Sequence, residues 1–267
     1  MSWLALYIKE LRLTKTKFLL NMVFLVMVGV LFYVLIERYN PFFIMLTVPL
    51  IILHLFYMFF AMLDSLRQEW KQNTAVFWMN IPKSGWQLLT AKYVAAMTHL
   101  FISLTLTFLI IYVLLYRSAP QFADPTIANF IIEQFQSFGW ILFIAIFFAS
   151  LQTGVVSTFI FMVAKSVRKW GWLLGTGIMV GGSWLWFRFQ ETAVYRVITE
   201  WGVVLKDETI MNSFFVQFDE VAGDPAIDME MTNAIILYAG TAVVDLLLVV
   251  GVLYICAWLL DKKVEAS

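Results

Sequence analysis

The sequence predicts an all-α membrane protein that crosses the bilayer about six times. Of its 267 residues, 62% are hydrophobic and only 13% are charged, against roughly 25% charged in a typical soluble protein. The mean hydropathy is +0.84. A soluble domain of this size could not cover so much apolar surface with polar side chains. The zero net charge gives no indication of a nucleic-acid partner.

Six stretches are long and apolar enough to cross a membrane, which takes about 20 residues of helix. They are residues 19–36, 42–63, 94–116, 138–163, 170–187 and 234–260. The fifth is short and rich in glycine, which allows close helix packing. We interpret it as a tightly packed span, with a broken or re-entrant helix as the alternative. No repeat is visible, so residues 1–267 are treated as one transmembrane domain.

The distribution of lysine and arginine predicts that both termini are cytoplasmic. With the N-terminus inside, the cytoplasmic segments hold 13 basic residues and the outer segments hold 5. Basic residues concentrate on the cytoplasmic side of membrane proteins. No cleavable signal peptide is expected, and the single Cys256 excludes a disulfide within one chain. The bacterial cytoplasmic membrane is the expected location.

Three segments outside the spans have a distinct character. Residues 2–18 place Leu4, Tyr7, Ile8, Leu11 and Phe18 on one helical stripe, which predicts an N-terminal helix at the membrane interface. A basic leader that only sets the topology is the alternative. Residues 188–233 form a long acidic outer segment, expected to hold one or two short helices. Residues 64–92 form the longest cytoplasmic loop.

The loop of residues 64–92 carries an unusual number of large aromatic side chains for a solvated segment. This composition favours a surface that packs against the rest of the chain or against a partner. Ser84 and Gln87 have the spacing of a capping box. A helix is therefore expected to begin after Pro82 and to continue into the third span.

No motif of a catalytic or nucleotide-binding site is present. The phosphate-binding pattern G-x-x-x-x-G-K-[ST], the zinc pattern H-E-x-x-H and the nucleophile pattern G-x-S-x-G are all missing. We therefore predict that the chain is not an enzyme and that it binds no metal or cofactor itself.

Few polar or ionisable side chains fall within the predicted spans. Asp245 lies deep in the sixth, where a carboxylate costs about 2.5–3.5 kcal/mol. His54, His99 and Gln152 lie in the second, third and fourth spans. These four residues are candidates for lining a transport pathway. The alternative is that they only form hydrogen bonds between helices.

The segment that follows the second span carries a resemblance to a known family. Residues 69–93 read EWKQNTAVFWMNIPKSGWQLLTAKY. The order of Glu69, Thr74, Phe77-Trp78, Pro82, Ser84 and Lys92 resembles the cytoplasmic segment of ABC exporter permeases of the second exporter class. Asn73 departs from the family, which often has glycine there. The span number, the cytoplasmic termini and the enlarged outer segment are also similar, so the resemblance covers nearly the whole chain.

The resemblance implies a membrane subunit of an ATP-driven exporter. Two permease chains, identical or different, would form the pathway in the lipid bilayer. Each would bind a separate ATP-binding-cassette ATPase, which holds ATP and Mg²⁺, through the loop between the second and third spans. The exported substrate would be hydrophobic or amphipathic: a peptide, an antimicrobial or a lipid. The residues expected at the ATPase-coupling surface are Asp64, Arg67, Glu69, Trp70, Lys71, Thr74, Phe77, Trp78 and Pro82.

Two other functions remain open. A membrane protein that transports nothing, such as a sensor or an assembly factor, would also lack a network of charges inside the membrane. An intramembrane enzyme would require Asp245 and a histidine to lie together.

Overall fold

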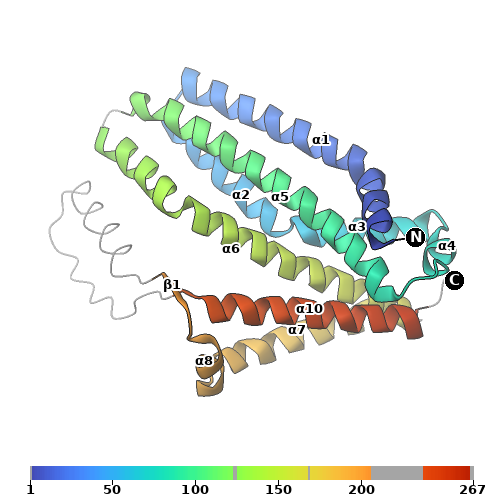
Figure 1. Ribbon diagram of the computed structural model, residues 1–267. Coiled ribbons are helices and arrows are strands. Elements are labelled where there is room, and N and C mark those ends of the chain that lie inside the picture. The colour runs from blue at the N-terminus through green and yellow to red at the C-terminus, as the bar shows by residue number, and fades with distance from the viewer. Residues whose placement is uncertain (1, 123–124, 168, 206–236, 265–267) are drawn as a thin grey trace.

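The computed structural model describes residues 2–122, 125–167, 169–205 and 237–264, and it is all-α apart from one short pair of strands (Figure 1). The main helices run lengthwise along the bundle, with a bend of 44° between two of them. They are α1 (Trp3–Arg38), α2 (Thr47–Leu55), α3 (Tyr57–Lys71), α5 (Gly85–Ser118), α6 (Pro125–Ser166), α7 (Gly171–Gln190) and α10 (Ala239–Lys262).

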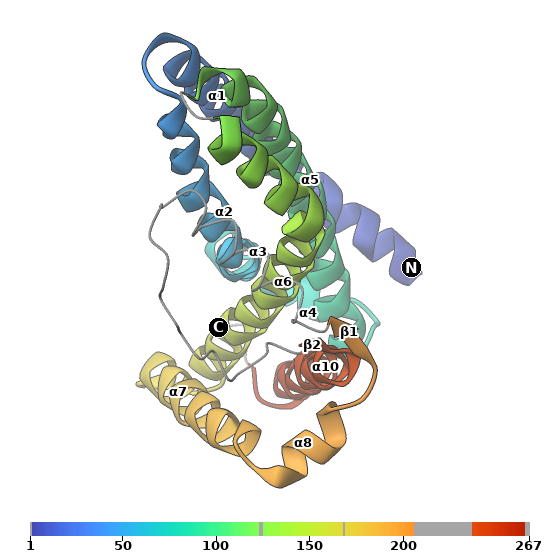
Figure 2. The same ribbon diagram turned by 90° about the vertical axis from the view of Figure 1, so that its left-hand side faces the viewer.

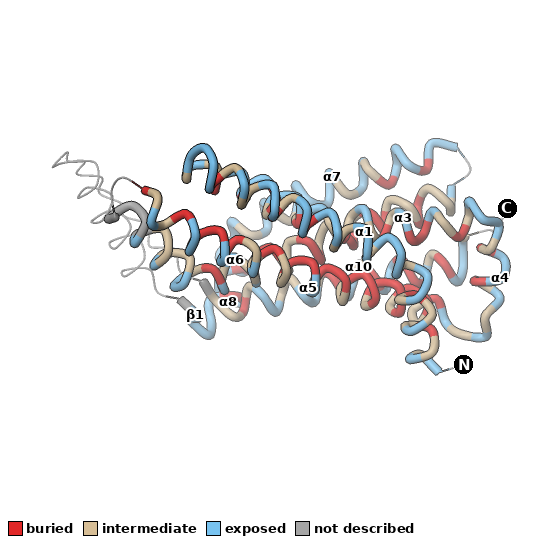
Figure 3. The backbone as a smooth tube through the Cα atoms, turned by 90° about the horizontal axis from the view of Figure 1, so that it is seen from above, coloured by how far each residue is buried: buried red, intermediate tan, exposed pale blue. Residues whose placement is uncertain are grey.

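Short elements connect the long helices at the two ends of the bundle. They are η1 (Pro41–Leu46), α4 (Ala75–Met79), η2 (Ala119–Gln121), α8 (Ala193–Thr199), β1 (Val203–Leu205) and β2 (Leu237–Tyr238). The strands β1 and β2 pair antiparallel. The start of α1 and the end of α10 lie at the end of the bundle that carries α4, whereas α8 and the strands lie at the opposite end (Figures 1 and 3).

Among the described residues, four helices are long and apolar enough to cross a membrane, or five if one bent pair counts as a span. The four are α1, α5 together with η2, the part of α6 from residue 131 onward, and α10. They match the first, third, fourth and sixth predicted spans. The bent pair matches the second. This number is lower than the six expected, because α7 does not reach the same hydropathy: five of its 20 residues are glycine. Figure 1 shows that α7 nevertheless runs lengthwise along the bundle, at an angle to α10.

The second predicted span is broken at Phe56, where α2 and α3 meet at 44°. Contacts from α6 satisfy backbone groups that the break frees. The Met58 N–H donates to Ser150 Oγ at 3.2 Å, and Thr153 Oγ1 donates to the Leu55 carbonyl at 2.8 Å. Such compensation is needed because an unpaired backbone group is costly away from water.

The N-terminal segment and the first span form one continuous helix, α1, capped by Ser2, whose Oγ accepts from the Ala5 N–H. The first turns of α1 lean away from the rest of the helix (Figure 2). Leu4 and Ile8 lie on the outer surface, while Leu6 and Glu10 are buried against the bundle.

The expected helix after Pro82 is confirmed, because α5 begins at Gly85 with Ser84 as its N-cap. The expected capping box is wrong: the Ser84 side chain forms no cap hydrogen bond. Instead the Gly85 N–H donates to Asp261 Oδ1 of α10 at 2.8 Å. An acidic side chain from another helix therefore stabilises the start of α5, which sequence spacing alone could not reveal.

The short helix expected within residues 188–233 is present as α8. Residues 206–233 of that segment lie outside the described residues. Burial is concentrated where α3, α5, α6 and α10 meet, around Met58, Met62, Leu89, Leu100 and Met162 (Figure 3).

Candidate functional site

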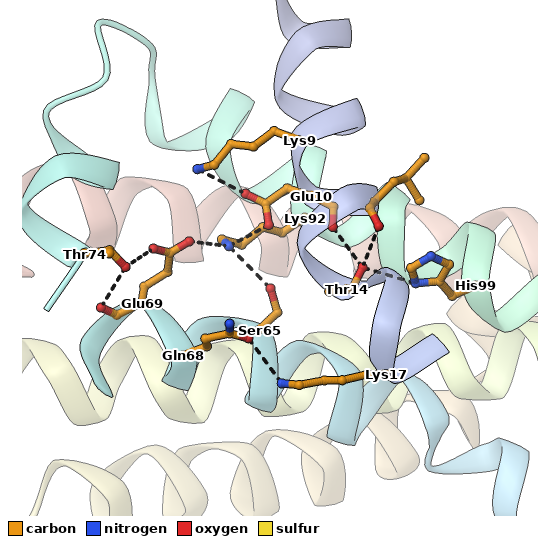
Figure 4. A network of polar contacts seen from close by, with 11 residues as sticks. Lys9, Glu10, Thr14, Lys17, Ser65, Gln68, Glu69, Thr74, Lys92 and His99 are labelled. Atoms are coloured by element: carbon orange, nitrogen blue, oxygen red, sulfur yellow. Dashed lines mark hydrogen bonds and ion pairs between the residues drawn. The ribbon is translucent and has the colours of Figure 1, made fainter. Parts of the chain in front are cut away.

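A buried cluster of charges joins α1, α3 and α5 near the α4 end of the bundle (Figure 4). Lys92 Nζ lies 2.8 Å from Glu10 Oε2 and 2.8 Å from Glu69 Oε1. It also lies 3.4 Å from Ser65 Oγ. Lys92, Glu10 and Glu69 are only 3%, 3% and 6% exposed. One ammonium group thus holds two carboxylates from two other helices, with little access for water.

The same cluster fixes the turn between α3 and α4. Thr74 Oγ1 donates to Glu69 Oε2 at 2.7 Å, and the Thr74 N–H donates to the Glu69 carbonyl at 2.9 Å. Asn73 has φ 56°, in the left-handed region that glycine and asparagine tolerate best. This conformation explains how asparagine can stand where the resembled family often has glycine.

The electrostatics of the cluster are unbalanced. Two carboxylates face one buried ammonium. Lys9 Nζ, 3.8 Å from Glu10 Oε1, supplies a more exposed second cation. The Lys92 ammonium also lies 5.1 Å from the ring centroid of Trp78, within range of a cation–π interaction. Removing Lys92 would therefore leave two buried like charges without their main partner, which is strongly unfavourable.

Further hydrogen bonds hold the first part of α1 along α5. They join Trp3 Nε1 to Thr90 Oγ1 at 3.1 Å, and Tyr7 Oη to Thr98 Oγ1 at 3.0 Å. One turn beyond Glu10, Thr14 Oγ1 lies 3.4 Å from His99 Nδ1. These contacts repeat at helical spacing, so this part of α1 presents a polar face to α5.

The residues expected at the ATPase-coupling surface divide into two groups. Glu69 and Trp78 are buried, and Trp70 and Thr74 are partly buried. The Trp70 ring packs edge-on against Phe161 of α6, with ring centroids 5.1 Å apart. The exposed members of the set are Asp64, Arg67, Lys71, Phe77 and Pro82. Only this second group could meet another protein directly.

Phe77 is the most exposed aromatic side chain of this loop, at 77%. It lies on α4 next to Val76, which is 46% exposed, while Trp78 on the same short helix is buried. Trp78 therefore anchors α4 in the core, and Phe77 points outward.

A cavity of about 320 Å³ lies between α1, α2–α3 and α5, and both histidines line it. His54 Nδ1 lies 2.9 Å from the Leu50 carbonyl, and His54 Nε2 lies 3.1 Å from Ser103 Oγ. The His99 ring stacks on Phe18 with centroids 4.3 Å apart. Glu10 and Lys92 line the same cavity. The structure thus brings two of the four candidate pathway residues together with the charge cluster.

Asp245 and Gln152 form a separate pair. Gln152 of α6 lies within hydrogen-bonding reach of Asp245 of α10, and neither residue lines the cavity that holds the histidines. The arrangement of Asp245 beside a histidine, which an intramembrane enzyme would need, does not occur. Within the part of the chain that is described, no group of three His, Cys, Asp or Glu side chains could hold a metal ion.

Sequence reasoning missed Glu10 and Ser65 in the charge cluster. Glu10 had a signal that could have been used: it is the one acidic residue in the first 36 residues, among four basic ones. Ser65 had none, because its role depends on how α3 packs against α5.

No family model matches this sequence, and no curated protein or solved structure matches it.

Proposed function

We propose that this chain is the permease subunit of an ATP-driven exporter of the second exporter class. The observation that carries the proposal is that Glu69, Thr74 and Lys92, three of the residues behind the sequence resemblance, meet in one buried cluster. These residues are spread over 24 positions of the sequence, and the aromatic composition of the loop does not by itself bring them together. Their meeting gives the loop a defined shape with α4 at its tip.

In this proposal α4 is the element that binds the ATPase subunit. Its outward residue Phe77 would enter a pocket on the partner, and the exposed Val76 and Pro82 would lie beside the contact. Aromatic anchors of this kind carry a large share of binding energy at protein interfaces. ATP and Mg²⁺ would be held by the partner.

The charge cluster would transmit movement of α4 into the membrane. Thr74 ties the base of α4 to Glu69, Glu69 is paired with Lys92 on α5, and Lys92 is paired with Glu10 on α1. A rigid, buried path of this kind moves as a unit, so a displacement of α4 would reach both helices. Two such chains in the bacterial cytoplasmic membrane, with their termini in the cytoplasm, would export a hydrophobic or amphipathic peptide, antimicrobial or lipid.

Co-purification tests the proposal. The chain is expressed with the ATP-binding-cassette ATPase encoded nearest to it, and the complex is isolated through a tag on this chain. We expect the ATPase to co-purify, and Phe77→Asp to reduce the yield of complex at least tenfold. Val197→Asp on α8, at the opposite end of the bundle, is the matched control because Val197 is 84% exposed.

Two results would contradict the proposal. If the ATPase does not co-purify with the unaltered chain, a membrane protein without transport activity, a sensor or an assembly factor, becomes the better interpretation. If Phe77→Asp and Val197→Asp have equal effects, the ATPase does not bind at α4.

A further inference from the structure

We propose that the surface formed by α1 and α3 binds an anionic phospholipid, with its phosphate at Arg67 and Lys71, beside the Lys17–Asp64 ion pair, and an acyl chain in the cavity between α1, α2–α3 and α5. The proposal does not depend on whether the chain is a permease.

The headgroup part of this site is a shallow hollow on the outer surface of α1 and α3. It is lined by Lys17, Asp64, Arg67, Gln68, Lys71 and Gln72. Three of these side chains are cationic and one is anionic, so the hollow carries a net positive charge. Asp64, Arg67 and Lys71 follow one another at spacings of three and four residues, which places them on one face of α3.

The acid in the hollow is already neutralised. Asp64 Oδ2 forms an ion pair with Lys17 Nζ, which also donates to Gln68 Oε1 at 3.2 Å. Arg67 and Lys71 are exposed and have no ion-pair partner among the described residues. Both cations are therefore available to an external phosphate, the group that arginine and lysine bind most readily.

The hollow lies at the level where the apolar surfaces of two helices end. On α1 the long apolar run starts directly after Lys17, and on α3 it stops directly before Asp64. The Lys17–Asp64 ion pair joins these two points. Charged side chains at the end of an apolar run lie at the lipid headgroup region in membrane proteins.

The cavity continues from the hollow into the apolar part of the bundle. Lys17 and Asp64 line both spaces. Leu25 and Leu50 form buried parts of the cavity wall, whereas Phe24, Leu53 and Phe60 are 57%, 62% and 63% exposed at its rim. An acyl chain of a phospholipid could therefore enter the cavity sideways from the bilayer while the phosphate of the same lipid lies in the hollow.

Native mass spectrometry of the full-length protein in detergent tests this site. The protein is mixed with dioleoylphosphatidylglycerol or, separately, with dioleoylphosphatidylcholine. We expect phosphatidylglycerol to bind more tightly than phosphatidylcholine. The double variant Arg67→Gln/Lys71→Gln should lower the affinity for phosphatidylglycerol about 30-fold, because each basic residue near a membrane surface contributes about fivefold to the affinity for an anionic lipid. The affinity for phosphatidylcholine should not change.

A matched control uses the basic pair at the end of α10. Lys262→Gln/Lys263→Gln removes the same charge from exposed positions at the same end of the bundle. We expect it to retain the affinity for phosphatidylglycerol. An equal loss in both double variants would overturn the proposal, as would equal affinities of the unaltered protein for the two lipids.

Binding of the acyl chain in the cavity is tested with dihexanoylphosphatidylglycerol and with inorganic phosphate. If the cavity holds an acyl chain, the short-chain lipid binds more weakly than the dioleoyl form and phosphate does not displace the latter. If phosphate displaces dioleoylphosphatidylglycerol, the hollow is a free anion site and the lipid proposal is wrong.

Discussion

The first half of α1 and helix α7 are held in the bundle by opposite means. The first half of α1 is fixed to its neighbours by a buried ammonium group with two carboxylates, and by hydrogen bonds from Trp3, Tyr7 and Thr14. Helix α7 instead approaches α6 closely through glycine. A Cβ added at Gly171 would lie 2.8 Å from Ala164 Cα.

The comparison distinguishes a helix whose position is fixed by polar contacts from a helix that leaves much of its apolar surface exposed. Polar contacts have directional geometry, so they fix the position of α1 relative to α5. On α7 the close approach to α6 is at Gly171 and Gly175, and at the other end Trp186 and Phe189 pack against Tyr195 of α8. Gly177 and Gly181 face open space, and Trp184 is 59% exposed. The free face of α7 suits lipid, which is as apolar as the side chains themselves.

The largest effect is expected from Lys92→Met. The substitution leaves Glu10 and Glu69 buried without their shared cation, and we expect it to lower the free energy of unfolding by about 3–5 kcal/mol. Denaturant unfolding of the purified protein in detergent measures the change. The triple variant Glu10→Gln/Glu69→Gln/Lys92→Met should recover most of the loss. If it does not, the charge imbalance is not the cause.

The glycines of α7 give the next largest effect and serve as controls for one another. Gly171→Ala forces the added Cβ against backbone atoms of α6, at a cost of about 1–3 kcal/mol. Gly177→Ala meets no atom within 4 Å, and should gain up to about 1 kcal/mol from its higher helix propensity. Thermal unfolding of the two variants measures both. A loss of stability in Gly177→Ala would mean that another chain covers this face.

The contact of α6 with the break at Phe56 gives a smaller effect. Ser150→Ala removes the acceptor of the Met58 N–H and should cost about 1 kcal/mol. Ser157→Ala is the control, because Ser157 Oγ is equally buried but donates to the Gly154 carbonyl of its own helix. Equal losses in thermal unfolding would show that the bond to Met58 stabilises nothing.

The smallest effect is expected at the ion pair of Lys17 and Asp64. It also joins α1 to α3, but both side chains are about half exposed. Lys17→Met should therefore lower the stability by less than about 1 kcal/mol, since water screens the pair. The same unfolding measurement as for Lys92→Met makes the two directly comparable. A loss as large as that of Lys92→Met would mean that exposure does not distinguish the two sites.

Much of the helical architecture could be predicted from apolar length alone. The first, third, fourth and sixth predicted spans fall in α1, α5, α6 and α10. The break at Phe56 could not be predicted, because it depends on Ser150 and Thr153, about a hundred residues away. For residues 170–187 a tightly packed span was expected, with a broken or re-entrant helix as the alternative, and the five glycines of α7 lower its hydropathy below that of the other spans.

The candidate site was predictable only in part. The order of Glu69, Thr74 and Lys92 drew attention to the right segment. That order does not show whether a side chain points outward or into the bundle. Glu69 was therefore expected on the surface, although its side chain turns inward to Lys92. Burial depends on helix rotation, and a single polar residue in a short helix does not determine it.

The hydrogen bonds of Met58 and Leu55 with α6 link the angle of the bent helix pair to the position of α6. If α2 and α3 formed one straight helix, the Met58 N–H would pair with the His54 carbonyl instead of Ser150 Oγ, and the Leu55 carbonyl would pair within the helix instead of with Thr153. The backbone groups would therefore stay paired, and the loss would fall on the buried Ser150 hydroxyl, since Thr153 Oγ1 also donates to the Ser150 carbonyl at 2.9 Å. A change in the angle at Phe56 would therefore alter the contacts between the bent pair and α6.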